Sequence, residues 1–511
     1  MKLTDIVETS RRVSETGGRR EKIEQLADAL RRAGPDEVPL AVAYLAGELP
    51  QGRIGIGPAK LRAAGPDHAA SEPSLELLEV DADLDAIAAV SGPGSEAERG
   101  RLLTHLLARA TRREQEFLGR LLLGELRQGA LEGIMVEAVA RAVDVPASAV
   151  RRALMFSGDL GQVAPAAFRE GREGLARFSI QLFRPVQPML AGTADDVAEA
   201  FDRLETAALE YKLDGARVQV HRAGDDVRVY TRKLNDVTTA VPELVERVRA
   251  LPVDEIILDG EALAFREDGR PQPFQVTMRR FGRKLDVEEM CRELPLDAFF
   301  FDILYLDGTS LADLPARDRL DAMSGLIPEK LAVPRIITSD PNRAEAFLRE
   351  ALEVGHEGLV AKSLDASYEA GRRGGSWLKL KPAHTLDLVV LAAEWGSGRR
   401  RGWLSNLHLG ARDPASGGFV MLGKTFKGLK DQTLEWQTRR LLELEVSRDA
   451  HTVYVRPELV VEIAFDGVQE SPTYPGGMAL RFARVKRYRP DKRPEDADTV
   501  EAVRRVYERR A

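Results

Sequence analysis

ALEYKLDGARVQVHR, residues 208–222, is the stretch of sequence on which the interpretation of the whole chain depends. Apolar and polar residues alternate on both sides of its centre, which predicts a β-strand. Gly215 breaks this pattern, because a glycine in a strand adds backbone entropy and has no side chain to pack. We therefore expect another part of the molecule to approach the backbone at Gly215. Lys212, three residues earlier, would in isolation be interpreted as a solvated lysine on an edge strand, so the rest of the chain must decide its role.

The composition is that of a globular protein with several cores. A chain of 511 residues predicts about three domains. Residues are 44% hydrophobic and 30% charged, which argues against disorder. No apolar run reaches the roughly 20 residues that a membrane helix needs. The first 15 residues contain no apolar h-region, so we expect no secretion signal. The single Cys291 excludes an internal disulfide. These features predict a cytoplasmic protein without membrane contact. Because the net charge is −7, any binding to nucleic acid must depend on local positive charge.

Three stretches with different patterns divide the chain. Residues 1–182 have helical periodicity, with a break predicted at Gly129. Residues 183–385 begin with a proline-containing connector and then alternate short β-branched runs with helical segments. Residues 386–511 contain many short strands and glycine-rich turns. We predict a multidomain protein with an all-α N-terminal domain, an α+β central domain and a C-terminal β-barrel.

One segment formally matches the phosphate-binding loop of P-loop NTPases. GGFVMLGKTF, residues 417–426, has Gly418, four further residues and then Gly-Lys-Thr. A phosphate-binding loop needs a flexible turn at those four positions, but Phe-Val-Met-Leu is typical of a strand. We interpret this segment as a barrel strand that ends in a turn.

Charged and aromatic residues recur downstream of Lys212, each in an otherwise apolar setting that we interpret as a strand end. Each of them has a plausible structural role when it is taken singly. Together and in this order they form a recognisable series: Glu261 in ILDGEALAF, Phe301 and Asp302 in FFFDILYLDG, Glu357 and Lys362 in GHEGLVAKS, and Arg373, Lys379 and Lys381 in GRRGGSWLKLKP.

This series resembles the covalent nucleotidyltransferase superfamily, and within it the ATP-dependent DNA ligases of the bacterial and archaeal monomeric type. The resemblance covers nearly the whole chain and implies a helical DNA-binding domain, an adenylation domain and a C-terminal OB-fold. The second motif, TRKLN, departs from the Ser-Arg-Asn of many relatives, so only the role of Arg232 is carried over. The motifs are KLDGAR (212–217), TRKLNDVT with Arg232, DGE (259–261), Phe301-Asp302, EGLVAK (357–362), WLKLK (377–381) and the R-x-D-K ending at Arg489, Asp491 and Lys492.

The resemblance implies a role for each candidate site residue. Lys212 would be the catalytic nucleophile that forms a covalent adenylate. Glu210 would read the adenine of ATP and Phe301 would stack on it. Glu261 would contact the ribose or a metal, and Glu357 would help to hold Mg²⁺, a cation that prefers oxygen ligands. The remaining cofactor-binding residues would contact nucleotide or nick phosphates: Arg217, Arg232, Arg373, Lys379 and Lys381.

The chemistry explains why a lysine needs this environment. An amine attacks phosphorus only when it is deprotonated, whereas a free lysine has a pKa of about 10.4. Nearby cations and partial burial would disfavour the ammonium form. Because positioning and charge neutralisation supply most of phosphoryl-transfer catalysis, the other residues are expected to act as clamps. The resemblance further implies that the barrel swings about a hinge near 382–387 between steps.

Nicked double-stranded DNA is the implied substrate, bound by a monomer in the nucleoid during repair, recombination or replication. ALRFARVKRYRPDKR, residues 479–493, holds seven Lys or Arg and one Asp, and GSGRRRGW and GKTFKGLK add basic loops. No sliding-clamp peptide is evident, so partner proteins stay open. Four alternatives remain: a GTP-dependent capping enzyme, an RNA-end ligase, a non-catalytic DNA-binding scaffold and, least supported, a P-loop ATPase.

Overall fold

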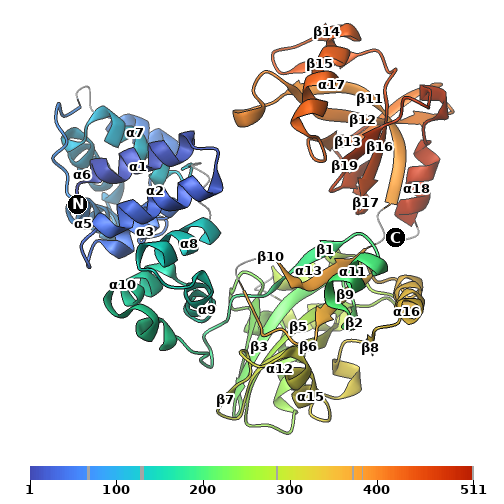
Figure 1. Ribbon diagram of the computed structural model, residues 1–511, viewed down its shortest axis with the longest axis horizontal. Helices are drawn as coiled ribbons and strands as arrows, with labels where there is room; N and C mark the ends of the chain where they lie inside the picture. Colours follow the sequence, from blue (N-terminus) through green and yellow to red (C-terminus); the bar gives the residue numbers. More distant parts are fainter. Residues whose placement is uncertain (66–68, 127–131, 283–285, 371–372, 382–383, 509–511) are drawn as a thin grey trace.

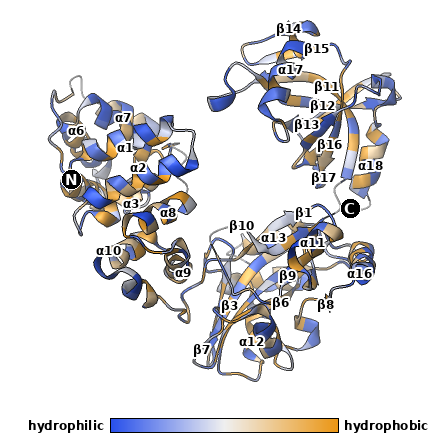
Figure 2. Cartoon of the chain, viewed as in Figure 1, coloured by the Kyte–Doolittle hydropathy of each residue, from blue (hydrophilic) through white to orange (hydrophobic). Residues whose placement is uncertain are grey.

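The chain forms three lobes that follow one another in sequence (Figure 1). The structure is a computed structural model and describes residues 1–65, 69–126, 132–282, 286–370, 373–381 and 384–508. The predicted break at Gly129 lies outside these residues. In the first lobe, most helices carry both hydrophobic and hydrophilic residues (Figure 2), whereas α3 (Val38–Ala46) is apolar almost throughout. The mixed pattern is expected of helices that bury one face.

The N-terminal lobe is entirely helical in its described part. Its helices pack around one apolar core that includes Leu30, Tyr44 and Leu118, all of them buried. A capping box between Thr111 and Glu114 starts α7. The helices are α1 (Leu3–Glu15), α2 (Arg19–Arg32), α3 (Val38–Ala46), α4 (Pro58–Ala64), α5 (Leu77–Ala89), α6 (Ser95–Arg109), α7 (Arg112–Leu122), α8 (Glu132–Ala142), α9 (Ala147–Ser157) and α10 (Leu160–Ala176).

The central lobe contains two five-stranded sheets. The first has the strand order β1-β10-β9-β2-β8 and the second β4-β3-β5-β6-β7. Separate apolar clusters pack on the two sheets. The strands are β1 (Leu190–Ala194), β2 (Ala207–Tyr211), β3 (Ala216–Ala223), β4 (Asp226–Thr231), β5 (Glu255–Ala264), β6 (Leu296–Leu306), β7 (Thr309–Ser310), β8 (Arg335–Thr338), β9 (Leu359–Ser363) and β10 (Arg373–Leu380); the helices are α11 (Val197–Leu204), α12 (Pro242–Arg249), α13 (Phe274–Phe281), α14 (Val287–Glu293), α15 (Ala316–Met323) and α16 (Pro341–Glu353).

The stretch around Lys212 is the crossing between these two sheets. β2 ends at Tyr211 in the first sheet, and β3 begins at Ala216 in the second. The prediction of one continuous strand was therefore wrong, whereas the close approach expected at Gly215 is confirmed. A Cβ atom at Gly215 would lie 2.3 Å from the carbonyl oxygen of Ala262 in β5. The absence of a side chain at Gly215 thus lets the crossing lie directly against β5.

The C-terminal lobe is the predicted barrel. The long strand β11 pairs with β12 along one edge and with β15 and β16 along the other, so the sheet curls around it. The segment GFVMLGKT forms β13, which confirms its interpretation as a strand and not a phosphate-binding loop. The elements are β11 (His384–Trp395), β12 (Leu404–Asp413), β13 (Gly418–Thr425), α17 (Asp431–Glu443), β14 (Glu445–Arg448), β15 (Thr452–Val455), β16 (Val460–Phe465), β17 (Gly467–Glu470), β18 (Met478–Arg481), β19 (Arg484–Tyr488) and α18 (Val500–Glu508).

The predicted fold class is confirmed: a helical lobe, an α+β lobe and an OB-type barrel follow one another. The boundaries at 182 and 385 stay predictions. The predicted hinge at 382–387 lies partly outside the described residues. Among the described helices, none combines the length and the apolar character that crossing a membrane requires.

Candidate active site

A cavity of about 720 Å³ opens in the central lobe, at the crossing between the two sheets. This volume lies within the range of ligand-binding pockets. Its wall includes seven of the residues predicted from the sequence: Glu210, Lys212, Arg217, Arg232, Glu261, Phe301 and Lys379. Glu261 and Phe301 lie inside β5 and β6, not at strand ends as expected. Two sheets that share a cavity can present residues from the middle of their strands.

Lys212 is held by a carboxylate that a second lysine shares. Its Nζ atom donates to Glu357 Oε2, and Lys381 Nζ donates to Glu357 Oε1 at 2.7 Å. The backbone fixes the same pair, because Lys212 N donates to Gly358 O at 2.8 Å and Glu357 N donates to Lys212 O at 3.1 Å. Burial by itself raises the pKa of Glu357, but the two lysines outweigh it and lower the pKa to about 2. Glu357 is thus an anion that holds the Lys212 and Lys381 side chains together.

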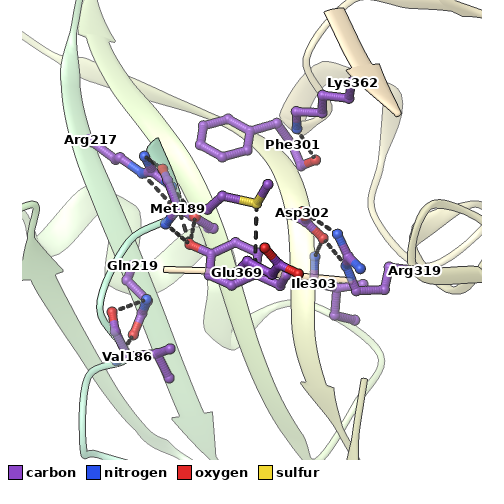
Figure 3. A network of polar contacts seen from close by, with 12 residues as sticks. Val186, Met189, Arg217, Gln219, Phe301, Asp302, Ile303, Arg319, Lys362 and Glu369 are labelled. Atoms are coloured by element: carbon purple, nitrogen blue, oxygen red, sulfur yellow. Dashed lines mark hydrogen bonds and ion pairs between the residues drawn. The ribbon is translucent and has the colours of Figure 1, made fainter. Parts of the chain in front are cut away.

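Arg217 lines the cavity but is engaged mainly by the protein. Its guanidinium donates to both oxygens of Asp259, at 3.0 and 2.6 Å, and to Met189 O at 2.6 Å. It also donates to the Tyr368 hydroxyl at 3.1 Å, which in turn donates to Asp259 at 2.6 Å. Figure 3 shows Arg217 and Met189 in this network. These four hydrogen bonds use most of the N–H donors of Arg217 and leave few for a phosphate. Its role in phosphate binding stays a prediction.

Glu210, Phe301 and Lys362 form another wall of the cavity, and Arg335 supports it from behind. Lys362 Nζ lies 2.7 Å from Glu210 Oε2 and donates to Phe301 O at 3.0 Å. The same ammonium lies 4.5 Å from the Phe301 ring centroid and 4.2 Å from that of Trp377. Arg335 contacts the other Glu210 oxygen. An aromatic face beside fixed polar groups suits a planar heterocycle.

Glu261 is the predicted metal ligand that faces the cavity directly. Burial raises its pKa to about 8, against the opposing effect of Lys212 and Arg217. A divalent cation near this carboxyl group would favour its ionised form, so Glu261 fits Mg²⁺. Within the described part of the chain, no three Asp, Glu, His or Cys side chains gather into a metal-binding group. A cation here would take other ligands from phosphate and water, as Mg²⁺ commonly does.

The remaining predicted residues fall into three groups. Arg232 is exposed at the cavity rim after β4, and Lys379 lines the cavity from β10. Neither Lys381 nor Glu357 belongs to the described lining of the cavity; Glu357 connects Lys381 to Lys212, which does line it. Arg373 starts β10, pairing with Leu190, and its side chain lies outside the described residues.

Several lining residues were missed by the sequence interpretation. Asn235 lines the cavity although it stands two residues later than the asparagine of many relatives. Leu234, just before it, has a φ of +63°, so the chain turns sharply there. Phe274, Met278 and Phe281 add an apolar wall from α13. The i, i+4 and i+7 spacing of these three was the available signal for one shared helix face.

The R-x-D-K ending lies away from the cavity. Arg489 donates to both oxygens of Asp387, at 3.2 and 3.1 Å, and Lys492 donates to the same carboxylate at 2.6 Å. Asp387 is in β11, at the end of the predicted hinge. These two cations are thus paired within the barrel, and they are absent from the described lining of the cavity.

Comparison with known proteins matches all three lobes to one family. The family model described as "ATP dependent DNA ligase domain" matches residues 188–381. The models described as "DNA ligase N terminus" and "ATP dependent DNA ligase C terminal region" match residues 63–140 and 400–492. The solved structure named "Pmar-Lig_Pre." has a TM-score of 0.61 at 19% identity, covering 95% of this chain and 99% of that one. At that identity the likeness shows the fold alone.

Relatives extend over the full length of the chain. A "Probable DNA ligase" of Anaeromyxobacter dehalogenans (strain 2CP-C) is 62% identical over 513 residues, covering 99% of this chain and 100% of the relative. Another of Sorangium cellulosum (strain So ce56) is 59% identical over 510 residues, covering 99% and 95%. A third, of Mycolicibacterium gilvum (strain PYR-GCK), is 55% identical over 512 residues and covers both chains fully. The chain belongs to the ATP-dependent DNA ligase family and is a ligase enzyme.

Proposed function

We propose that this ligase seals nicks in duplex DNA, joining a 3′-hydroxyl to a 5′-phosphate through a covalent lysyl-AMP and an adenylated DNA. The observation that carries the proposal is the cavity itself. One space holds an amine on a restrained lysine, a flat aromatic face and a set of charged groups suited to a triphosphate. Lys212 stands at the crossing between both sheets, so residues of either sheet can act on a group bound next to its amine.

In the first step Lys212 Nζ attacks the α-phosphorus of ATP. A nitrogen–phosphorus bond forms, the bond from that phosphorus to the bridging oxygen breaks, and pyrophosphate leaves while the amine loses a proton. The Lys212–Glu357 contact must open for this attack. Arg232 and Lys379 would neutralise phosphate charge and Phe301 would stack on the base; that all three line the cavity supports these roles. The protein therefore contributes mainly orientation and a fixed electrostatic environment.

Mg²⁺ fits this site through Glu261 and Glu357. When bound, it would supply charge neutralisation for the triphosphate and the leaving pyrophosphate. Glu261 is the stronger candidate, because Glu357 is already neutralised by Lys212 and Lys381. The loss of positive charge on Lys212, once it carries AMP, leaves Glu357 with one cation fewer.

Two further steps complete the reaction. An oxygen of the 5′-phosphate attacks the adenylate phosphorus and releases Lys212. The 3′-hydroxyl then attacks the 5′-phosphorus, and AMP leaves. To reach pyrophosphate in the first step, Arg489 and Lys492 would have to leave Asp387. The proposal therefore includes a rotation of the barrel between steps, about residues near 382–387.

The DNA-binding surface of the barrel would be built from three basic segments: 396–403, 423–430 and 479–493. Arg400 donates to Phe426 O, and Val485 N donates to Lys427 O at 3.0 Å, so segments far apart in sequence lie side by side. Their Lys427 and Lys486 side chains are exposed. Clustered cations on an acidic protein favour contact with a phosphate backbone, with little base readout. Binding by a monomer, in repair, recombination or replication, completes the proposal.

A sealing assay tests this function. The substrate is a duplex with one nick and a labelled 5′-phosphate, incubated with the full chain, Mg²⁺ and either ATP or GTP. We expect a joined strand with ATP and no product with GTP. Parallel substrates with an RNA nick and with an unphosphorylated nick serve as controls. A joined product only on RNA, or only with GTP, would replace the proposal with an RNA-end ligase or a capping-type enzyme.

A further inference from the structure

Arg335 occupies a position outside the cavity that no motif predicts. It lies on β8, whose register places it directly opposite Glu210 on β2. Its Nε donates to Glu210 Oε1 at 2.7 Å, and its Nη2 lies 2.6 Å from the same oxygen. Arg335 does not belong to the described lining of the cavity, whereas Glu210 does. Any effect of Arg335 on a bound molecule must therefore pass through another residue.

Arg335 and Lys362 both contact the Glu210 carboxylate and the Phe301 carbonyl oxygen. Lys362 takes the second Glu210 oxygen at 2.7 Å and donates to Phe301 O at 3.0 Å. Arg335 Nη2 also donates to Phe301 O, at 3.3 Å. Figure 3 shows Lys362 directed at the Phe301 carbonyl. Glu210 belongs to the first sheet and Phe301 to the second, so the two cations fasten the sheets together at one wall of the cavity.

The two cations fix the orientation of the Glu210 carboxylate, and with it the direction from which Glu210 can accept a further hydrogen bond. Its side chain is only 3% exposed, and each oxygen already accepts from one cation. A carboxylate has about four acceptor sites, so capacity for a further donor remains. Without Arg335, one oxygen would lose its charged partner and the carboxylate could turn about its last torsion, which is broad and roughly two-fold.

We infer that Arg335 is a positioning residue for base selection: by holding Glu210 and Phe301 in one relative geometry, it makes the cavity favour a purine with a 6-amino donor over a purine without one. This inference rests on the proposed adenylation by ATP and adds a residue that sets its specificity. An amino group beside Glu210 donates to a fixed anion. A purine that lacks the group leaves that anion with an unused acceptor.

The test compares ATP with purine riboside triphosphate, which is ATP without the 6-amino group, in single-turnover formation of the covalent nucleotidyl-enzyme. For the wild type we expect a preference for ATP of about tenfold to a hundredfold, the range for a hydrogen bond to a charged group. Arg335→Met should reduce this preference to about threefold or less, chiefly through a raised KM for ATP. Arg335→Lys keeps a positive charge but lacks the planar guanidinium group, so its preference for ATP should lie between those of the wild type and Arg335→Met.

Arg222→Met is the matched control. Arg222 likewise lies on a strand of the central lobe, but it is buried where Arg335 is half-buried, and it donates to the backbone carbonyls of Gly224, Val248 and Leu251. Its removal should lower stability without changing the preference for ATP. The inference is overturned if the wild type shows no preference, if Arg335→Met keeps the wild-type ratio, or if Arg222→Met loses it equally. If Arg335→Met does not fold, Arg335→Lys decides by the same ratio. A wild type that forms no nucleotidyl-enzyme at all would instead contradict the proposed function.

Discussion

Replacing Gly215 with alanine tests whether the crossing at Lys212 depends on close contact with β5. An added Cβ would lie 2.3 Å from Ala262 O, 2.7 Å from Leu263 Cγ and 3.0 Å from Glu261 Cγ. Gly215 is not among the positive-φ glycines, so the effect is steric and not a matter of backbone strain. The nearest atom belongs to the backbone of a central strand and cannot move alone. Overpacking of this kind costs about 1–3 kcal/mol, and we expect the upper end of that range.

The same overlap should displace Lys212 relative to Glu261. A shift of about 1 Å in a reacting group can cost a hundredfold in rate, so adenylate formation should fall by about that factor while the protein is still folded. The assays are urea unfolding and single-turnover labelling with ATP. Gly100→Ala is the control, because its Cβ would meet nothing within 4 Å in the interior of α6. It should stabilise by about 0.5–1 kcal/mol. Wild-type stability and labelling in Gly215→Ala would refute the reasoning.

Further predictions concern charge. Although burial by itself raises the pKa of Glu394, hydrogen bonds from Lys424, His408 and Asn406 lower it to about 2. The ionised group therefore stabilises the fold fully above its ordinary pKa of 4.5, and this contribution is lost as the pH falls toward 2. Urea midpoints of the wild type and Glu394→Gln should differ at pH 6, begin to converge as the pH falls below 4.5 and meet near pH 2; a constant difference would contradict the assignment. Affinity for a nicked duplex, measured by fluorescence anisotropy, should fall at least about tenfold between 50 and 200 mM salt if phosphate contacts dominate, and a flat profile would exclude them. Asp387→Asn removes an ion-pair partner of Lys492 and one of the carboxylates that hold Arg489, which keeps Asp491. An ion pair is worth about 1 kcal/mol, so the change should speed adenylate formation up to about fivefold at low ATP; an unchanged or slower rate would count against barrel rotation.

The sequence predicted the three lobes because each has its own periodicity. It also indicated seven of the residues that line the cavity, Lys212, Glu261 and Phe301 among them, but only because the order of the motifs resembles a known family; singly, each of these residues has a plausible structural role. Gly215 was informative because a glycine is poorly suited to a strand, and it marked the point where the backbone of β5 approaches.

Contacts between residues far apart in sequence could not be predicted. Arg335 contacts Glu210, which is 125 residues away in sequence, and Tyr368 contacts Asp259, which is 109 residues away. No local pattern distinguishes these residues from other arginines and tyrosines. Pairing also changes what a residue can do: Arg217 lines the cavity as expected, yet Asp259 and Tyr368 hold most of its donors. Local sequence indicates the type of a side chain, whereas strand register decides what it contacts.

The central claim is that the Lys212 amine carries AMP, and chain labelling tests it most directly. The full-length protein is incubated with α-labelled ATP and Mg²⁺, denatured, and digested to locate the label, alongside Lys212→Ala and the control Lys233→Ala, a second lysine of the cavity wall. We predict label on the peptide that contains Lys212 in the wild type and in Lys233→Ala, and none in Lys212→Ala. Label that persists in Lys212→Ala, or that maps to another peptide, would contradict the account.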